Sequence, residues 1–313
     1  MPLLSPFTIF VHKKMRLGVT RGQRFPHKEA LPVSAVCFLC KGISTIAIRY
    51  GRSPRAVPNT IKDKSMKWFR KEKEAGRLFY STDLHSHILP GIDDGSPDID
   101  TSIQLLRAMQ SWGIKHIFAT PHIIDDVYEN SPATIEPACQ VLKAKMTQEG
   151  IDMEVRYSAE YRMDEHFREL RQSGTTALIP LPGQRLLVEN SFLQAPIDLD
   201  EILFRLMLDG IQPILAHPER YRYFHENKEI YHHLHSNGCH FQVNLLSLAG
   251  YYGKTIKEVA WWLCKNGMVE FLGSDLHTME QADAISAWLS SKEFRKVEEL
   301  LPSLQNDRLS TDK

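Results

Sequence analysis

The sequence has no long apolar run, few cysteines and no glycine-rich nucleotide motif. In its 313 residues no apolar stretch approaches the roughly 18 residues that cross a membrane, which argues against membrane insertion. The five cysteines show no disulfide framework, so we expect a reducing, cytoplasmic compartment. No GxGxxG or Walker loop is present to support a dinucleotide- or nucleotide-binding fold.

Net charge is also absent, because 38 basic residues balance 38 acidic ones, but the charges are unevenly distributed. Residues 1–65 contain twelve Lys or Arg and two acids. This leaves 66–313 with 26 basic and 36 acidic residues, a net charge of −10. An acidic body argues against nucleic acid as a partner.

The basic first part of the chain has scattered prolines and little hydrophobic periodicity. We therefore predict a disordered extension over 1–65 and one domain over 66–313, with Met66 as a natural beginning of the protein. The apolar run before Cys40 is too short to span a membrane and too deep for a signal peptide. Cys37 and Cys40 form a CxxC pair without a second pair, so we expect no metal or redox role there.

A histidine-rich stretch, DLHSHILPGIDDG, begins at Asp83. If Tyr80 to His85 is a strand, His85 and His87 point to the same face, because side chains alternate along a strand. Two imidazoles at a strand end, with a carboxylate on the following loop, suit a divalent metal. Taken alone, an HxH pattern is equally typical of ordinary buried histidines.

The rest of the chain alternates between strands and helices. Strands are predicted at 80–85, 115–120, 153–159, 185–188, 212–216, 240–243 and 268–273, and helices from Ser96-Pro97 to Gly113, from Ser131-Pro132 to Gly150, over 200–209, 229–237 and 255–266, and onward to about Leu301. This alternation predicts an α/β fold with a parallel sheet. Six of the seven strands end in His, Asp or Glu, and the other ends in Asn244. Because strand ends converge at the mouth of a β/α barrel, a closed or nearly closed barrel is favoured over an open sheet.

The polar residues at these strand ends and on the loops that follow form a candidate metal centre. They are His85, His87, Asp94, His122, Glu160, Glu189, His217, Asp275 and His277. This set is too large for one ion, but two or three metals sharing bridging carboxylates would use it. The mixture of imidazole and carboxylate suits Mn, Fe or Zn better than Mg or Ca.

Paired metals are typical of phosphate ester hydrolysis, in which a bridging hydroxide attacks phosphorus. Arg220, three residues after His217, is placed to pair with the phosphate oxygens, although a surface salt bridge is the alternative. No dedicated general acid is evident. This favours an aryl ester, since a tyrosinate with a pKa near 10 leaves with little protonation.

Together these motifs resemble the polymerase and histidinol phosphatase (PHP) superfamily. The matching segments are DLHSHILPGIDDG from Asp83, ATPH ending at His122, AEY around Glu160, VE ending at Glu189, AHPER ending at Arg220 and GSDLH ending at His277. They are most similar to the bacterial capsule and exopolysaccharide branch, the manganese-dependent protein-tyrosine phosphatases. The resemblance covers about 78–280.

The resemblance implies a distorted seven-stranded β/α (TIM-like) barrel with three Mn²⁺ ions at the C-terminal strand ends. It implies that the nine residues above are the metal ligands and that Arg220 binds phosphate. The implied substrate is phosphotyrosine on a cognate bacterial tyrosine autokinase that controls polysaccharide export. A homo-octamer in this family goes with an ExxRR motif in an early helix, which is missing from Asp98 to Trp112, so the oligomeric state is open.

Two other functions remain open. A small-molecule phosphatase of the histidinol-phosphate type would have the same metal centre with a closed, acid-lined pocket. Five aromatic residues follow the later strands and would flank an aryl ring, or merely pack at the rim: Phe192, Tyr221, Tyr223, Tyr251 and Tyr252. A metal-stabilised binding module without turnover is the second alternative. A nuclease is disfavoured, because the acidic body would repel a polyanion.

Overall fold

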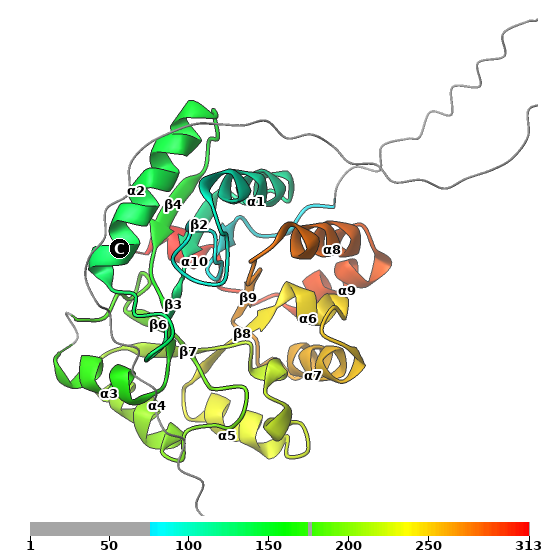
Figure 1. Cartoon of the computed structure of the whole chain (residues 1–313). Coiled ribbons are helices and arrows are strands. Elements are labelled where there is room, and N and C mark those ends of the chain that lie inside the picture. The colour runs from blue at the N-terminus through cyan, green and yellow to red at the C-terminus, as the bar shows by residue number, and fades with distance from the viewer. Residues whose placement is uncertain (1–75, 175–176, 313) are drawn as a thin grey trace, which may run out of the picture. The chain divides into compact units, whose positions relative to one another are not determined.

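The computed structural model describes residues 76–174 and 177–312. By its internal contacts the chain divides into Met1–Lys67 and Trp68–Lys313, and Figure 1 shows the fold of the second unit. The predicted extension over the first 65 residues, its cysteine pair and the proposed beginning at residue 66 lie outside the described residues. The predicted division into extension and domain therefore stays a prediction.

Short parallel strands form the centre of the second unit, which confirms the predicted α/β class. They make two sheets, with the orders β1-β2-β4 and β3-β5-β6-β7-β8-β9. The strands are β1 (Thr82–Asp83), β2 (His116–Ala119), β3 (His122–Ile123), β4 (Glu154–Tyr157), β5 (Glu160–Arg162), β6 (Arg185–Glu189), β7 (Gln212–Ala216), β8 (His240–Asn244) and β9 (Phe271–Gly273). Most residues of β6, β7 and β8 are buried, as expected for parallel strands covered on both faces.

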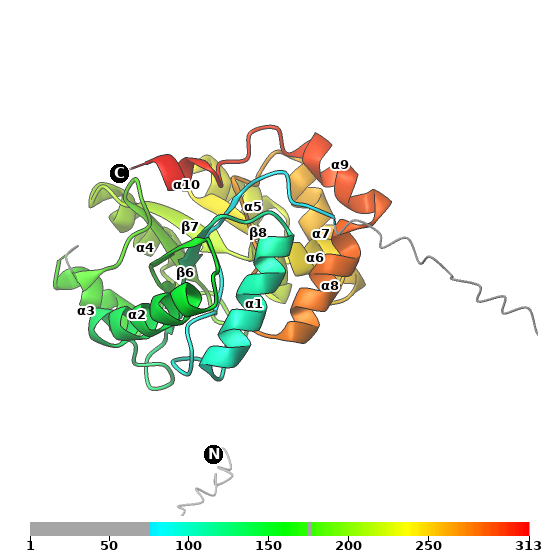
Figure 2. The same cartoon turned by 90° about the horizontal axis from the view of Figure 1, so that it is seen from above.

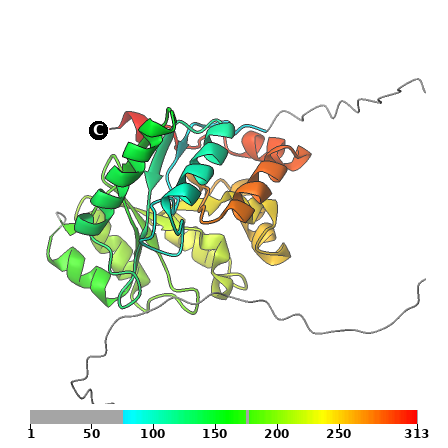
Figure 3. The same ribbon diagram turned by 45° about the horizontal axis from the view of Figure 1, so that its top comes forward.

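Helices surround these strands (Figures 1 and 3). They are α1 (Ile99–Ser111), α2 (Pro132–Gln148), α3 (Glu165–Gln172), α4 (Leu199–Leu208), α5 (Glu229–Ser236), α6 (Leu245–Ala249), α7 (Lys254–Lys265), α8 (Met279–Leu289), α9 (Lys292–Leu300) and α10 (Arg308–Thr311). Helices α3, α6 and α10 are additional to the predicted set. Across 76–174 and 177–312, none of the helices has the length and apolar character that crossing a membrane requires.

The helix ends follow from capping chemistry, with one correction. The second predicted helix begins as expected, with Ser131 as N-cap and Pro132 as its first residue. The prediction that Ser96 and Pro97 open the first helix is wrong. Asp98 is the N-cap instead, since its Oδ1 accepts a hydrogen bond from the Thr101 amide at 2.8 Å.

Two of the seven predicted strands, β2 and β4, are each followed by a further short strand that was not predicted. β3 follows β2 after a break at Thr120 and Pro121, and β5 follows β4 after a break at Ser158 and Ala159. Proline has no amide hydrogen, so it cannot donate to a neighbouring strand. The Ser158 amide still donates to the Ala119 carbonyl (2.9 Å), and the Glu160 amide to the Pro121 carbonyl (3.1 Å). The chain therefore passes from one sheet to the other at these breaks.

Backbone hydrogen bonds join the segments that follow β1 and β9, the first and last strands. The predicted strand from Tyr80 is only two residues long, but a parallel bridge links Ser86 to Leu276. The His87 amide donates to the Leu276 carbonyl (3.0 Å), and the Asp275 amide to the His85 carbonyl (2.8 Å). As assigned, the described strands form two open sheets, so the closed seven-stranded barrel stays a prediction.

The segment that contains α10 seals the other end of the strands, and Figure 2 shows α10 at the edge of the domain. Asn306 is fully buried and lies between β1 and β9. Its Nδ2 donates to the carbonyls of Thr82 (2.9 Å) and Leu272 (2.7 Å), and its Oδ1 accepts from the Leu272 amide (3.0 Å). Leu309 packs into a separate apolar cluster with Leu84 and Phe271. One side-chain amide thus replaces the missing backbone pairing between β1 and β9.

Replacing Asn306 with alanine should lower the free energy of unfolding by about 2–4 kcal/mol, because it leaves three buried backbone groups without partners. Urea unfolding followed by tryptophan fluorescence, at fixed metal concentration, measures the change. Asn266→Ala is the matched control, because Asn266 is exposed and bonds only within its own helix end; it should cost less than about 0.5 kcal/mol. Equal midpoints for the two variants would contradict the bridging role.

Candidate metal centre

All nine predicted ligand residues lie together, on the segments that follow β1, β2, β4, β7 and β9 and at the end of β6. Their side-chain atoms fall into four groups that could each hold a metal ion, with the atoms of a group within 4.8 Å of one another. The groups are His87–Asp94–His122–His277, His85–His87–Glu160, His85–His217–Asp275 and His122–Glu160–Glu189. Shared members join the groups into one cluster, so several ions would be neighbours.

The two histidines of the HxH motif converge although the strand before them is shorter than predicted. His85 and His87 are both fully buried, and their Nε2 atoms lie 3.2 Å apart. The bonds to the strand that ends at Leu276 keep this segment extended, so the two side chains still share a face.

Glu160, the first residue of β5, is the centre of the cluster. Its Oε2 lies 3.0 Å from Nδ1 of His122, 3.3 Å from Nε2 of His85 and 3.4 Å from Nε2 of His87. Its Oε1 lies 2.9 Å from Nε2 of His217. A carboxylate with four imidazoles around it is in position to bridge ions.

Charge holds the cluster in its ionised state. Burial alone would raise the pKa of Glu160, but the charges of His85 and His122 keep it well below its ordinary value. Burial alone would lower the pKa of His122, whereas the charge of Glu160 raises it, to about 10. Protons on the imidazoles therefore balance the carboxylates, and a divalent cation would take the place of those protons.

Several buried ligand atoms have no hydrogen-bond partner in the described part of the chain. They are Nδ1 of His122 and of His217, and Oε2 of Glu160 and of Glu189. His122 Nδ1 and Glu160 Oε2 are only 3.0 Å apart but are not aligned as a hydrogen bond. Since unpaired buried polar atoms are costly, two such atoms that lie close together without bonding each other fit a metal site.

The remaining carboxylate at the rim is different. The side chain of Asp94 is 54% exposed, and its Oδ1 lies 3.5 Å from Nε2 of His122 and 3.7 Å from Nε2 of His277. It is the only exposed member of the four groups described. An ion bound there would be the one most open to solvent.

Supporting residues that were not predicted hold the histidines in place. Asp93 accepts from Nδ1 of His87 at 2.7 Å and from the amide of Gly95 at 3.0 Å. Gln242 bonds Nδ1 of His85 at 2.7 Å through its Oε1. Such contacts fix which ring nitrogen faces the metal. The paired acids of the DDG motif were the only sequence signal for Asp93.

Asn244, at the one strand end without a predicted ligand, holds a ligand residue from the neighbouring strand end. Asn244 donates from Nδ2 to Oδ2 of Asp275 at 2.6 Å and accepts from Nε2 of Gln242 at 2.7 Å. Its backbone amide donates to the buried Glu219 at 2.9 Å. Asn244 is therefore a positioning residue for Asp275.

The backbone is unusual at three positions around the cluster. His217 and Asp275 have φ of 36° and 49°, in the left-handed region that non-glycine residues seldom adopt. At Gly95, a Cβ would collide with the backbone of His87. The turns that aim these ligands thus accept local strain, and only glycine fits beside His87.

Arg220 lies at the edge of the cluster, as predicted. Its Nη1 donates to Oδ2 of Asp275 at 2.8 Å. Its guanidinium carbon lies 4.6 Å from the ring centre of Phe192 and 4.3 Å from that of Tyr252. Cation–π contacts on two sides hold the guanidinium in place.

The other three aromatic residues do not contact the guanidinium. Tyr221 is fully buried, Tyr223 donates to the Ser191 carbonyl at 2.9 Å, and Tyr251 donates to Glu280 at 3.2 Å. Of the predicted aryl-binding set, Phe192 and Tyr252 are therefore the two beside Arg220.

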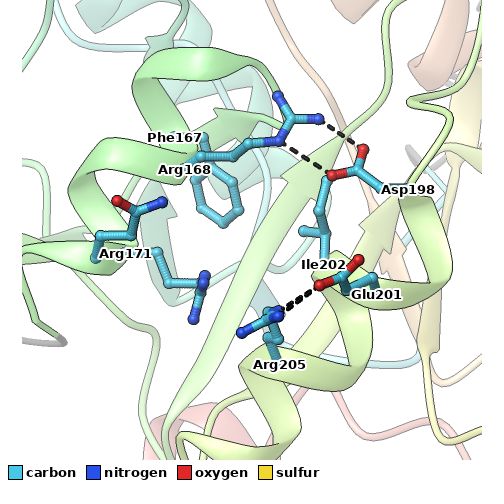
Figure 4. Close-up of a pocket in the computed structure, with 8 residues that line it drawn as sticks. Phe167, Arg168, Arg171, Asp198, Glu201, Ile202 and Arg205 are labelled. Atoms are coloured by element: carbon cyan, nitrogen blue, oxygen red, sulfur yellow. Dashed lines mark hydrogen bonds and ion pairs between the residues drawn. The ribbon is translucent and has the colours of Figure 1, made fainter.

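A pocket of about 330 Å³ lies apart from this cluster, between α3 and α4 (Figure 4). Three arginines line it. Arg168 forms a bidentate pair with Asp198 (2.7 and 3.2 Å), Arg205 pairs with Glu201 (2.8 Å), and Arg171 pairs with a carboxylate at the end of α4 (3.1 Å). Each guanidinium already has a carboxylate partner, so the pocket offers little free positive charge. The pairs made by Arg168 and Arg171 link α3 to the two ends of α4.

Comparison with known proteins gives a consistent assignment. Residues 81–286 match the family model described as "Capsular polysaccharide synthesis, CpsB/CapC". The chain is 34% identical over 204 residues to tyrosine-protein phosphatase YwqE of Bacillus subtilis (strain 168), covering 63% of this chain and 78% of that protein. It is 26% identical over 206 residues to tyrosine-protein phosphatase CpsB of Streptococcus pneumoniae, covering 63% and 83%.

A solved structure agrees with the sequence relatives. It comes from work on YwqE from Bacillus subtilis and CpsB from Streptococcus pneumoniae, there called unique metal-dependent tyrosine phosphatases. The TM-score is 0.59 at 31% identity, over 71% of this chain and 94% of that one. Relatives of this chain are thus metal-dependent tyrosine phosphatases.

If the cluster holds metal, Asp93→Asn should weaken its metal affinity about 10- to 100-fold, because His87 loses the carboxylate that orients it. Competition with a chelator of known affinity measures the dissociation constant. Asp209→Asn is the control, since Asp209 pairs only with Arg171 at the surface. A metal affinity within about twofold of the unaltered protein would refute the orienting role.

Proposed function

Because the chain belongs to the CpsB/CapC family of capsular polysaccharide synthesis proteins, we propose that it is a metal-dependent protein-tyrosine phosphatase. The observation that carries this proposal is the single cluster of nine His, Asp and Glu residues with Arg220 at its edge. The cognate substrate is phosphotyrosine on a bacterial tyrosine autokinase, and its hydrolysis regulates capsule or exopolysaccharide production.

The metal ligands in this proposal are His85, His87, Asp94, His122, Glu160, Glu189, His217, Asp275 and His277. They hold two or three ions. The mixture of imidazoles and carboxylates suits Mn, Fe or Zn, and the family resemblance favours Mn²⁺ among these. When bound, such ions supply positive charge to the phosphate oxygens and make water a stronger nucleophile at neutral pH.

The chain's own residues bind and orient the ester. Arg220 is anchored by Asp275 and by two aromatic rings, so its remaining N–H groups are presented in a fixed direction toward the phosphate oxygens. Phe192 is 45% exposed and also stacks on His217, with ring centres 5.6 Å apart. An aromatic wall beside the phosphate site favours an aryl ester over the cationic histidinol phosphate.

The finer architecture is part of the same proposal. We infer that the strands make a distorted seven-stranded barrel, in which β2 with β3 and β4 with β5 each occupy one position. Closure of the barrel between β1 and β9 is supported by the backbone bonds between the segments that follow these two strands. It is also supported by Asn306, which bonds to both strands. We also infer a cytoplasmic location, since Cys139, Cys239 and Cys264 are buried free thiols. A homo-oligomer is left to direct measurement.

The function is tested with a phosphotyrosine peptide. Release of phosphate should depend on added Mn²⁺, and His217→Ala should reduce it by about 100-fold or more, because the His85–His217–Asp275 group loses a ligand. His233→Ala is the control, since His233 is exposed and pairs with Asp200. A much higher rate on histidinol phosphate would establish the small-molecule alternative. Full metal occupancy without hydrolysis of either ester would establish a binding module.

Phe192→Ala should lower the preference for an aryl over an alkyl phosphate ester by about 2- to 10-fold, because the aryl ring of the substrate loses the side chain on which it stacks. The ratio of kcat/KM for phenyl phosphate and a primary alkyl phosphate measures this preference. The adjacent Leu193→Ala is the control, as Leu193 is 91% exposed. Equal loss on both esters would show that Phe192 only holds Arg220.

A further inference from the structure

A second arginine, Arg162, contacts the cluster through a different ligand residue from the one that Arg220 contacts. Arg162 ends β5, and side chains alternate along a strand, so it shares a face with Glu160. The side chain of Tyr161, between them, points to the other face, and its hydroxyl accepts a hydrogen bond from the Ile179 amide at 2.8 Å. The Arg162 side chain is 25% exposed, so it lies at the border between the buried ligands and solvent.

Arg162 is bound to a ligand residue through one oxygen. Its Nε and Nη2 both donate to Oε1 of Glu189, at 3.2 and 3.0 Å. A guanidinium has five N–H donors, so three remain, and no bond from them is formed within the described residues. The other carboxylate oxygen, Oε2 of Glu189, has no hydrogen-bond partner there either. Glu189 can therefore face a metal with one oxygen while Arg162 holds the other.

The two arginines border different ligand groups that touch. Arg220 is bound to Asp275, in the group with His85 and His217, and Arg162 is bound to Glu189, in the group with His122 and Glu160. The groups meet where Nε2 of His217 lies 2.9 Å from Glu160 and 4.0 Å from Glu189. A phosphate placed over this junction would have a guanidinium on each side.

We propose that Arg162 is a second phosphate-binding residue, which meets the oxygens of the ester from the side opposite Arg220. This inference rests on the proposed phosphatase function. Charge on the transferred phosphoryl group is spread over three oxygens, so one arginine leaves part of it without a donor. A bare ion pair with Glu189 would be satisfied by the two N–H groups already used. The other N–H groups of Arg162 lie at the solvent border beside the ligand atoms, where oxygens of an ester can replace water as their acceptors.

The test measures phosphate binding directly, by calorimetric titration of inorganic phosphate into the manganese-loaded protein. Arg162→Ala should bind phosphate about 10- to 100-fold more weakly, and Arg162→Lys should fall between it and the unaltered protein. Bound metal, determined by elemental analysis of the same samples, should stay constant. The control is Arg107→Ala, because Arg107 also pairs with a glutamate, Glu149, at 2.8 Å but lies on an exposed helix face; it should bind phosphate normally.

Unchanged phosphate affinity in Arg162→Ala would overturn the inference. So would a loss of phosphate binding that is matched by a loss of metal, because Arg162 would then only support Glu189. If Arg162→Ala does not fold, a fully metal-loaded Arg162→Lys with normal phosphate affinity and normal KM would overturn it equally. A parallel assay of the unaltered protein on phosphotyrosine peptide separates the two proposals. Phosphate binding that depends on Arg162, without peptide hydrolysis, would refute the tyrosine phosphatase and leave this site standing.

Discussion

The need to balance the charges of buried carboxylates is the constraint on which the rest of this structure depends. Carboxylates of Glu160, Glu189 and Asp275 are almost completely buried. Glu160 and Glu189 share one ligand group, and Glu160 and Asp275 both contact His85. Unpaired, such groups would be too costly to keep ionised inside a protein. Here each lies against imidazoles or an arginine, and the unbonded atoms of His122, Glu160 and Glu189 belong to residues of one ligand group. The site is therefore arranged so that bound cations complete the charge balance that protons hold without them.

The fold meets this constraint by bringing distant segments to one edge. Parallel strands run in the same direction, so the residues that follow β1, β2, β4, β7 and β9 and the last residue of β6 meet although they are far apart in sequence. The buried apolar residues below keep water out of that edge. Behind the ligands, Asp93, Gln242 and Asn244 hold imidazoles and carboxylate in position, at distances of 2.6–2.7 Å. Strained turns at His217 and Asp275 are tolerated because these surroundings fix them.

Much of the site was predictable, because strand ends can be recognised from hydrophobic runs and their polar terminal residues. The nine candidate ligands and Arg220 all lie where that argument placed them. Residues such as Gln242 and Arg162 were not predictable in the same way, since their roles depend on which neighbouring side chain they meet across the sheet. The breaks near Pro121 and Ser158 and the contact of Asn306 with β1 also arise only in three dimensions, since that contact joins residues 224 positions apart.

The placement of Asn306 and Leu309 has a consequence for how the chain is made. Both follow all the described strands in sequence, so the ribosome synthesises them after every one of those strands. Until they emerge, the Thr82 carbonyl of β1 lacks the Asn306 side chain that bonds to it, and Leu84 and Phe271 lack the Leu309 side chain that packs on them. Nascent chains with apolar surface uncovered are prone to aggregate. Translation must therefore pass Leu309 before the domain can close, and products that stop earlier should depend on chaperones.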